Sequence, residues 1–119
     1  MTPKDLRRKL RGQPGLKPAF KRRWLKALRG GEYKQGRAVL HDDRGSFCCL
    51  GVAADIELDA WWEMDAFCYV LLPSRAAGVL RQEAIDQMGL SAGAAAMLAI
   101  ANDRGLTFSQ IADTIEECL

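Results

Sequence analysis

Residues 18–29 read PAFKRRWLKALR, a helical pattern with one apolar face and one basic face. The apolar residues recur at the spacing of one side of a helix, which predicts packing against a core: Phe20, Trp24, Leu25 and Leu28. Pro18 suits the first turn, and the two glycines at 30 and 31 are suited to end the helix. The opposite side carries only cations: Lys21, Arg22, Arg23, Lys26 and Arg29. We therefore expect a core helix that presents five positive charges to its surroundings.

The segment before this helix is also basic and predicts a short helix over residues 2–12, with Thr2 as its cap. Its only apolar residues are Leu6 and Leu10, and one such pair does not define a core face. We therefore expect this helix to dock loosely or to become ordered only on a partner. The chain is divided accordingly into a basic N-terminal helical extension, residues 1–16, and a single globular domain, residues 17–119.

The segment after residue 30 contains both strand and helix signals. Residues 37–40 and 46–49 predict the strands of a hairpin, and residues 67–72 predict a third strand beside them. Residues 50–56 fit either an extension of the second strand or a helix of small residues, and we favour the helix. Three more helices are predicted: residues 74–88, ended by Gly89, with a break near residues 78–80 as the alternative; a helix capped by Ser91; and a last helix with a Thr107–Gln110 capping box. The expected fold is α+β, a mostly helical single domain with a small antiparallel β-hairpin or three-stranded sheet.

Charge is distributed unevenly along the 119 residues, although the formal net charge is only +2 and the hydrophobic content of 49% is that of one ordinary globular domain. Residues 1–40 contain 13 Lys and Arg against 2 acidic residues, a balance of +11. Residues 41–119 contain 4 against 13, a balance of −9. This polarity indicates that charged surfaces decide what the protein binds.

Membrane and secreted classes do not fit the sequence. No apolar run approaches the roughly 18–20 residues that span a bilayer, and the basic N-terminus lacks the apolar core of a secretory signal. The cysteines are interpreted as reduced thiols: Cys48, Cys49, Cys68 and Cys118. We expect a cytoplasmic protein with no membrane partner.

The basic N-terminal part is the strongest candidate for a binding surface. Its cations are Arg7, Arg8, Arg11, Lys21, Arg22, Arg23, Lys26 and Arg29. Three partners need these same residues: a nucleic acid bound directly through its phosphates, an acidic protein surface, or the acidic part of this chain or of a second copy in a homo-oligomer. The sequence leaves all three open.

A denser acidic group lies in the middle of the chain: Asp55, Glu57, Asp59, Glu63 and Asp65. It is a candidate docking face for a basic partner or an imitation of nucleic-acid charge, and its alternative interpretation is a solvated loop.

A cysteine-dependent enzyme is the weakest of the alternatives. A nucleophilic Cys48 or Cys49 needs a base, and the chain has one histidine, His41, across the predicted turn. No C-x₂-C or H-x₃-H spacing for zinc and no glycine-rich phosphate loop is present. We therefore expect no catalytic residues, no metal site and no cofactor.

Four segments together resemble a group of small uncharacterised proteins from bacteriophages and prophages. They are Trp24-x₃-Leu28-x₂-Gly31-x-Tyr33-x-Gln35-Gly36, Cys48-Cys49-Leu50-Gly51-Val52, Leu72-Pro73, and Ala101-Asn102-Asp103-x-Gly105-x₂-Phe108-x₂-Ile111-Ala112-Asp113. The resemblance runs from about residue 24 to the C-terminus and leaves residues 1–20 outside. The same glycine and turn residues are also interpreted as structural, so that the pattern can define the fold throughout.

The resemblance implies a context for function. Small phage proteins without catalytic motifs often bind and block or redirect a host macromolecule, which includes inhibitors of the anti-CRISPR kind. The leading hypothesis is a non-enzymatic phage protein in the bacterial host cytoplasm whose partner is a host protein or a protein–nucleic-acid complex.

Overall fold

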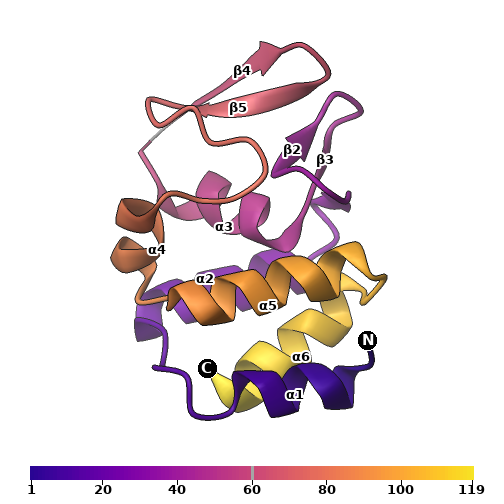
Figure 1. Cartoon of the computed structure of the whole chain (residues 1–119), viewed down its shortest axis with the longest axis vertical. Helices are drawn as coiled ribbons and strands as arrows, with labels where there is room; N and C mark the ends of the chain where they lie inside the picture. Colours follow the sequence, from indigo (N-terminus) through magenta and orange to yellow (C-terminus); the bar gives the residue numbers. More distant parts are fainter. Residues whose placement is uncertain (60) are drawn as a thin grey trace.

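The structure, a computed structural model, describes residues 1–59 and 61–119, and in these residues it contains six helices and a five-stranded mixed sheet (Figure 1). The helices are α1 (Pro3–Leu10), α2 (Pro18–Arg29), α3 (Cys49–Glu57), α4 (Gln82–Met88), α5 (Ala92–Asp103) and α6 (Phe108–Cys118). The strands are β1 (Lys34–Gln35), β2 (His41–Asp42), β3 (Ser46–Phe47), β4 (Trp61–Asp65) and β5 (Cys68–Leu72). The α+β prediction is confirmed.

The sheet has the order β1-β3-β2-β5-β4 and forms one end of the molecule (Figure 1). β1 pairs with β3 in parallel, and the other three pairs are antiparallel. The predicted third strand therefore exists as β5, which lies beside the hairpin strand β2. The sheet exceeds the predicted three strands because β1 and β4 extend its two edges.

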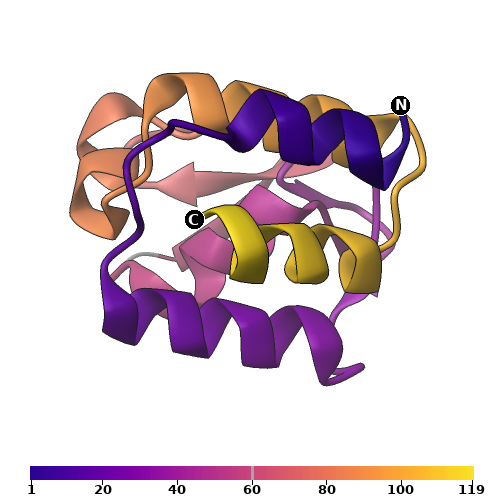
Figure 2. The same ribbon diagram turned by 90° about the horizontal axis from the view of Figure 1, so that it is seen from below.

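The helices form the other end of the molecule. Seen from below, α6 lies between α1 and α2, with α5 behind α1 (Figure 2). The core is built from the apolar faces of these helices and of α3. Trp24 of α2 is fully buried, and its indole N–H donates to the Cys49 carbonyl at 3.0 Å, so that α2 is fixed against the start of α3. The apolar side predicted for residues 18–29 therefore faces the core.

The first helix is an integral part of this core. Leu6 and Leu10 have 0% exposure, and α1 packs against α5 and α6. The expected loose docking is therefore wrong. Two leucines are enough to hold α1 in place because this short helix packs on apolar residues of α5 and α6 that would otherwise be exposed to water.

Two predicted strands have different positions in the structure. The backbone of residues 37–40 bonds outside the sheet: the Ala38 N–H donates to the Asp103 side chain, and the Leu40 N–H donates to the Ala77 carbonyl. Ala38 also has a φ of 72°, which interrupts an extended strand. The second strand ends at Phe47 because Cys48 caps α3, its Sγ accepting from the Gly51 N–H.

The helix predicted over residues 74–88 forms only from Gln82 onward. The Ser74 hydroxyl bonds to the Leu71 carbonyl and accepts from the Ala76 N–H, so Ser74 makes a turn and caps no helix. The other local signals are confirmed: Gly89 ends α4 in the left-handed region, Ser91 caps α5, and Thr107 and Gln110 form the capping box of α6.

Candidate functional site

The exposed side of α6 carries three carboxylates, and basic residues of α1 and α2 bind to them from both sides. Arg7 of α1 donates to Glu117 at 2.6 Å. Arg29 of α2 donates to Asp113 at 2.8 Å and to Glu116 at 3.0 Å, and these two bonds raise the pKa of its guanidinium. Lys21 donates to the Glu116 backbone carbonyl at 3.1 Å. Part of the candidate basic surface is thus used to hold the helices of this chain together.

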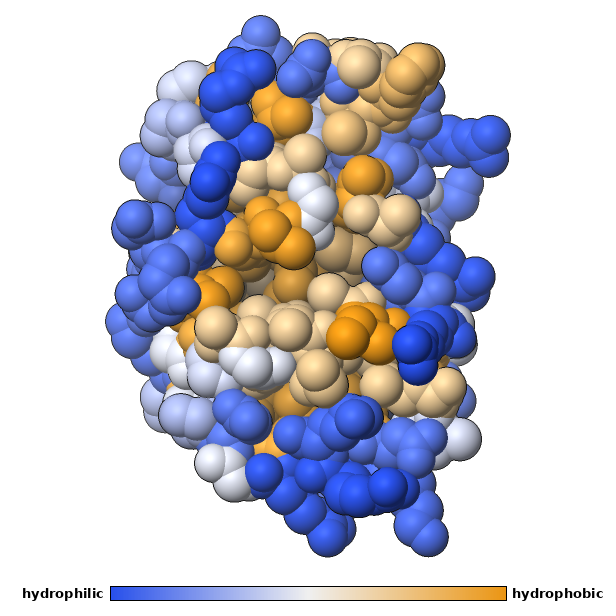
Figure 3. Space-filling view, viewed as in Figure 1, coloured by the Kyte–Doolittle hydropathy of each residue, from blue (hydrophilic) through white to orange (hydrophobic). Residues whose placement is uncertain are grey.

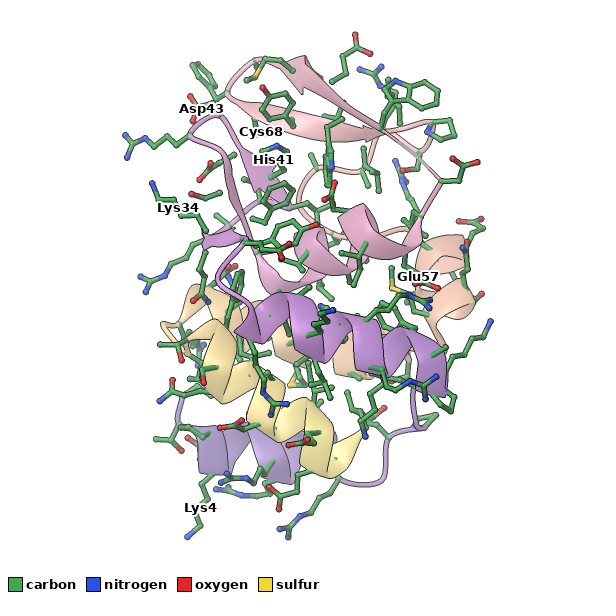
Figure 4. All side chains as sticks on the ribbon, turned by 180° about the vertical axis from the view of Figure 1, so that it is seen from behind. Lys4, Lys34, His41, Asp43, Glu57 and Cys68 are labelled. Carbon is green, nitrogen blue, oxygen red and sulfur yellow. The ribbon has the colours of Figure 1, made fainter. Side chains whose placement is uncertain are left out.

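One further candidate cation is bound by the candidate acidic group. Arg23 of α2 donates through two guanidinium nitrogens to the Glu57 carboxylate at the end of α3. Figure 4 shows Glu57 at the level of α2, on the same side of the molecule. Four of the eight candidate cations, Arg7, Lys21, Arg23 and Arg29, therefore have acceptors in distant parts of the chain.

The other four point outward. Arg8, Arg11, Arg22 and Lys26 are exposed, and among the described residues Arg8 alone of them has an ion pair, with Asp5 one turn before it. A surface ion pair of this kind contributes little and leaves the guanidinium accessible. The structure therefore divides the predicted basic face into four cations that bind distant residues of the chain and four that do not.

The α1 cations surround a hollow between α1 and the end of α6. Its cavity volume is about 590 Å³, and it is lined by Lys4, Arg7, Arg8, Arg11 and Glu117. Figure 4 shows Lys4 pointing away from the domain at this end of the molecule, opposite the end that holds His41 and Asp43. We call this feature the cationic hollow. Its lining consists of four cations and one carboxylate, without an apolar side chain.

Sequence patterns identify only part of the cationic hollow. Lys4 was not among the candidates, although it lies one turn before Arg8 at helical spacing. Glu117 could not be found this way, because it is 110 residues away from Arg7, its partner.

The predicted acidic face does not form one free surface. Asp55 accepts bonds from the Tyr33 hydroxyl and the Trp62 indole, Glu57 is bound to Arg23, and Asp65 lies 3.5 Å from Arg75. Desolvation and the Asp55 carboxylate raise the pKa of the Tyr33 hydroxyl, which keeps that donor protonated. Of the five candidates, Asp59 and Glu63 are exposed and form no ion pair within the described residues.

Cys48 and Cys49 do not form a catalytic pair with His41. His41 stacks between Phe47 and Tyr69, with ring centroids 3.9 and 4.3 Å away, and its Nδ1–H donates to the Ser46 carbonyl. Since His41 pairs with Phe47, the next residue, Cys48, faces the other side of the hairpin. Burial raises the pKa of the Cys48 thiol and, further, that of Cys49, so neither is an activated nucleophile.

Four residues of the sequence pattern quoted above, Gln35, Gly36, Cys49 and Asn102, meet at the junction of the helices and the sheet. Asn102 is fully buried, and its side-chain oxygen accepts from the Gln35 amide at 3.0 Å and from the Cys49 N–H at 3.1 Å. Its amide donates to the Gly36 carbonyl at 2.8 Å, and Gln35 also bonds to Leu106 and Phe108. These contacts explain the pattern residues Gln35, Gly36, Cys49 and Asn102 as parts of a structural network.

Metal and membrane sites receive no support from the described geometry. In residues 1–59 and 61–119, no three His, Cys, Asp or Glu side chains are placed to hold a metal ion. Within the same residues no single helix is long and apolar enough to cross a bilayer. One pair of helices, α4 and α5, has sufficient combined length and apolar character, but the two helices are bent by 97° relative to each other.

Exposed apolar side chains lie away from the cationic hollow. Figure 3 shows an apolar band across the middle of one face, over α5, and a hydrophilic lower end where α1 lies. The large exposed hydrophobic residues are Trp61, Met64, Phe67 and Val79, from the β4–β5 hairpin and the segment before α4. The two ends of the molecule therefore differ in chemistry as well as in fold.

The comparisons with known proteins concern the region after α1. Residues 16–119 match the family described as a domain of unknown function (DUF8296). No curated protein and no solved structure matches the chain. The cationic residues of α1 lie outside the matched region, whereas α2 lies within it.

Proposed function

This chain belongs to the DUF8296 family, a domain of unknown function, and within it we propose a non-enzymatic binding protein of bacteriophage type that acts in the host cytoplasm on a host protein–nucleic-acid complex. It inhibits or redirects that complex, as an anti-CRISPR protein does. The phage-type residue pattern supports the context, and the surface supports the mode of action.

One observation carries the proposal. After the chain's own carboxylates have bound Arg7, Arg23 and Arg29, exposed cations still project from both basic helices: Lys4, Arg8 and Arg11 on α1, and Arg22 and Lys26 on α2. The cations that join separate helices are thus distinct from these five, of which Arg8 is paired only with Asp5 in its own helix. An outward group of this size attracts and orients an anionic partner.

Charge also follows the architecture. Residues 1–29 and 107–119, which contain α1, α2 and α6, carry 11 Lys and Arg against 4 acidic residues, a balance of +7. Residues 30–106, which contain the sheet together with α3, α4 and α5, carry 6 against 11, a balance of −5. The protein would therefore approach an anionic partner with its helical end first.

Affinity capture from a bacterial lysate tests this function. The tagged wild-type chain is compared with a variant that carries Arg22→Gln and Lys26→Gln, and with a control that carries Arg44→Gln and Arg104→Gln, two exposed arginines outside both basic helices. Wild type and control should retain the same host complex, and the α2 variant should retain several-fold less. Parallel captures after nuclease treatment report whether a nucleic acid joins the partner to the protein.

Equal capture by the α2 variant and the wild type would contradict a role for the outward cations of α2. A doubled mass in sedimentation without any captured host component would instead indicate that opposite charges bring two copies of this chain together.

A further inference from the structure

We propose that the cationic hollow between α1 and α6 is a binding site for the phosphate groups of a nucleic-acid backbone. This inference rests on the proposed function and deepens it, because it names the chemistry of the partner and the site that meets it.

The composition of the lining carries the first step. Lys4, Arg7, Arg8 and Arg11 fall within eight consecutive residues of α1 and its cap, which is about 10 Å of helix. Three of the four are arginines, whose planar guanidinium groups fit phosphate oxygens with two parallel hydrogen bonds. Such a density of cations matches a polymer with one negative charge per about 1.7 Å of duplex.

The absence of apolar side chains from the lining favours a nucleic acid over an acidic protein. The cores of protein interfaces are apolar and rest on buried aromatic or aliphatic residues. The lining of the cationic hollow contains no apolar side chain, and the large exposed hydrophobic residues lie at the sheet end. Without an aromatic side chain to stack on bases, the hollow contacts the backbone and is indifferent to sequence.

Glu117 gives the site an internal competitor. Its carboxylate holds Arg7 at 2.6 Å, while 53% of the Glu117 side chain stays exposed at the hollow. An incoming phosphate must share Arg7 with this carboxylate and is repelled by it. Removal of the Glu117 charge should therefore strengthen phosphate binding. A general attraction to the positive end of the molecule would not single out this residue.

The test measures binding of the full chain to a short fluorescent DNA duplex, a single strand of the same composition and an acidic polypeptide, between about 50 and 200 mM salt. The double variant Arg8→Gln and Arg11→Gln should lower duplex affinity at least tenfold and reduce the slope of log K against log salt by about 2. Glutamine is a good helix former, so α1 should persist. Equal melting temperatures by circular dichroism check this.

Two further variants make the test specific. Glu117→Gln should tighten duplex binding roughly two- to fivefold, the range expected when one surface ion pair no longer competes. The control Arg44→Gln with Arg104→Gln removes the same charge from outside the basic helices and should change affinity less than twofold.

The outcomes separate this site from the proposed function. If neither the duplex nor the single strand binds, or only the acidic polypeptide does, the phosphate site is wrong while capture of a host complex can still succeed. Equal losses in the α1 variant and the control would reduce the effect to net charge and would overturn the site. A weaker duplex affinity in Glu117→Gln would contradict the competition.

Discussion

Gly51 lies in α3 where that helix passes against the backbone of Leu40. A Cβ atom at this position would lie 1.9 Å from the Leu40 carbonyl oxygen, which is a backbone atom and cannot turn aside. The same loop supplies the Leu40 carbonyl that accepts from the Cys48 N–H. A glycine is therefore needed at this point for the hairpin and α3 to pack together.

The substitution Gly51→Ala should lower the free energy of unfolding by roughly 3 kcal/mol or more, the size expected when a backbone contact must shift. Urea unfolding followed by circular dichroism measures it. Gly93→Ala is the matched control, because its added Cβ would lie 3.5 Å from the nearest atom, in the Gln13 side chain. That variant should be neutral or more stable by about 0.5–1 kcal/mol. Similar losses in both variants would contradict the packing argument.

At the scale of secondary structure, α1 covers the groove between α5 and α6 with two leucines. Both are fully buried, and the chain after α1 is tied to the C-terminal cap of α6, since the Leu16 N–H donates to the Leu119 carbonyl. α1 therefore contributes to stability as well as to the charged surface.

The substitution Leu10→Ala should lower the free energy of unfolding by about 2–4 kcal/mol, the usual loss when a fully buried leucine leaves a cavity. Lys9→Ala, at the exposed neighbouring position, should change stability by less than about 0.5 kcal/mol. Thermal melting of both variants measures the difference. A loss below about 1 kcal/mol for Leu10→Ala would indicate that α1 is only loosely attached.

Local signals predicted the elements whose stabilising contacts are local. The signals for α2, α5 and α6 lie within short stretches of sequence, and the structure confirms these three helices. Strand positions depended on distant partners. β1 exists because it pairs with β3, and residues 37–40 leave the sheet because Asp103 and Ala77 accept their N–H groups. The same limit applies to the cationic hollow, whose three arginines are predicted from the sequence but whose Lys4 and Glu117 are not.

Across the whole molecule, the acidic side of α6 joins two basic helices that would otherwise repel each other. Arg7 reaches it from α1, and Arg29 and Lys21 reach it from α2 (Figure 2). The polarity of the sequence is thus partly neutralised by folding, which is one of the three interpretations that the sequence left open. The cations left over on the outer sides of α1 and α2 are the ones available to a partner.

Replacing the three α6 carboxylates by amides, as Asp113→Asn, Glu116→Gln and Glu117→Gln, tests this arrangement. The balance of residues 1–29 and 107–119 rises from +7 to +10, and three ion pairs are lost. Each exposed pair is worth about 0.5 kcal/mol after solvent screening, so the free energy of unfolding should fall by about 1–2 kcal/mol at low salt. Because a Debye length of about 8 Å screens such charges at physiological ionic strength, the loss should shrink as salt is added.

The control is Asp43→Asn, Asp59→Asn and Glu63→Gln, which removes as many exposed carboxylates without breaking a described ion pair. Chemical denaturation in urea over a range of salt concentrations compares the two. An equal loss in the control would show that net charge matters, and that the α6 carboxylates have no special role in holding α1 and α2.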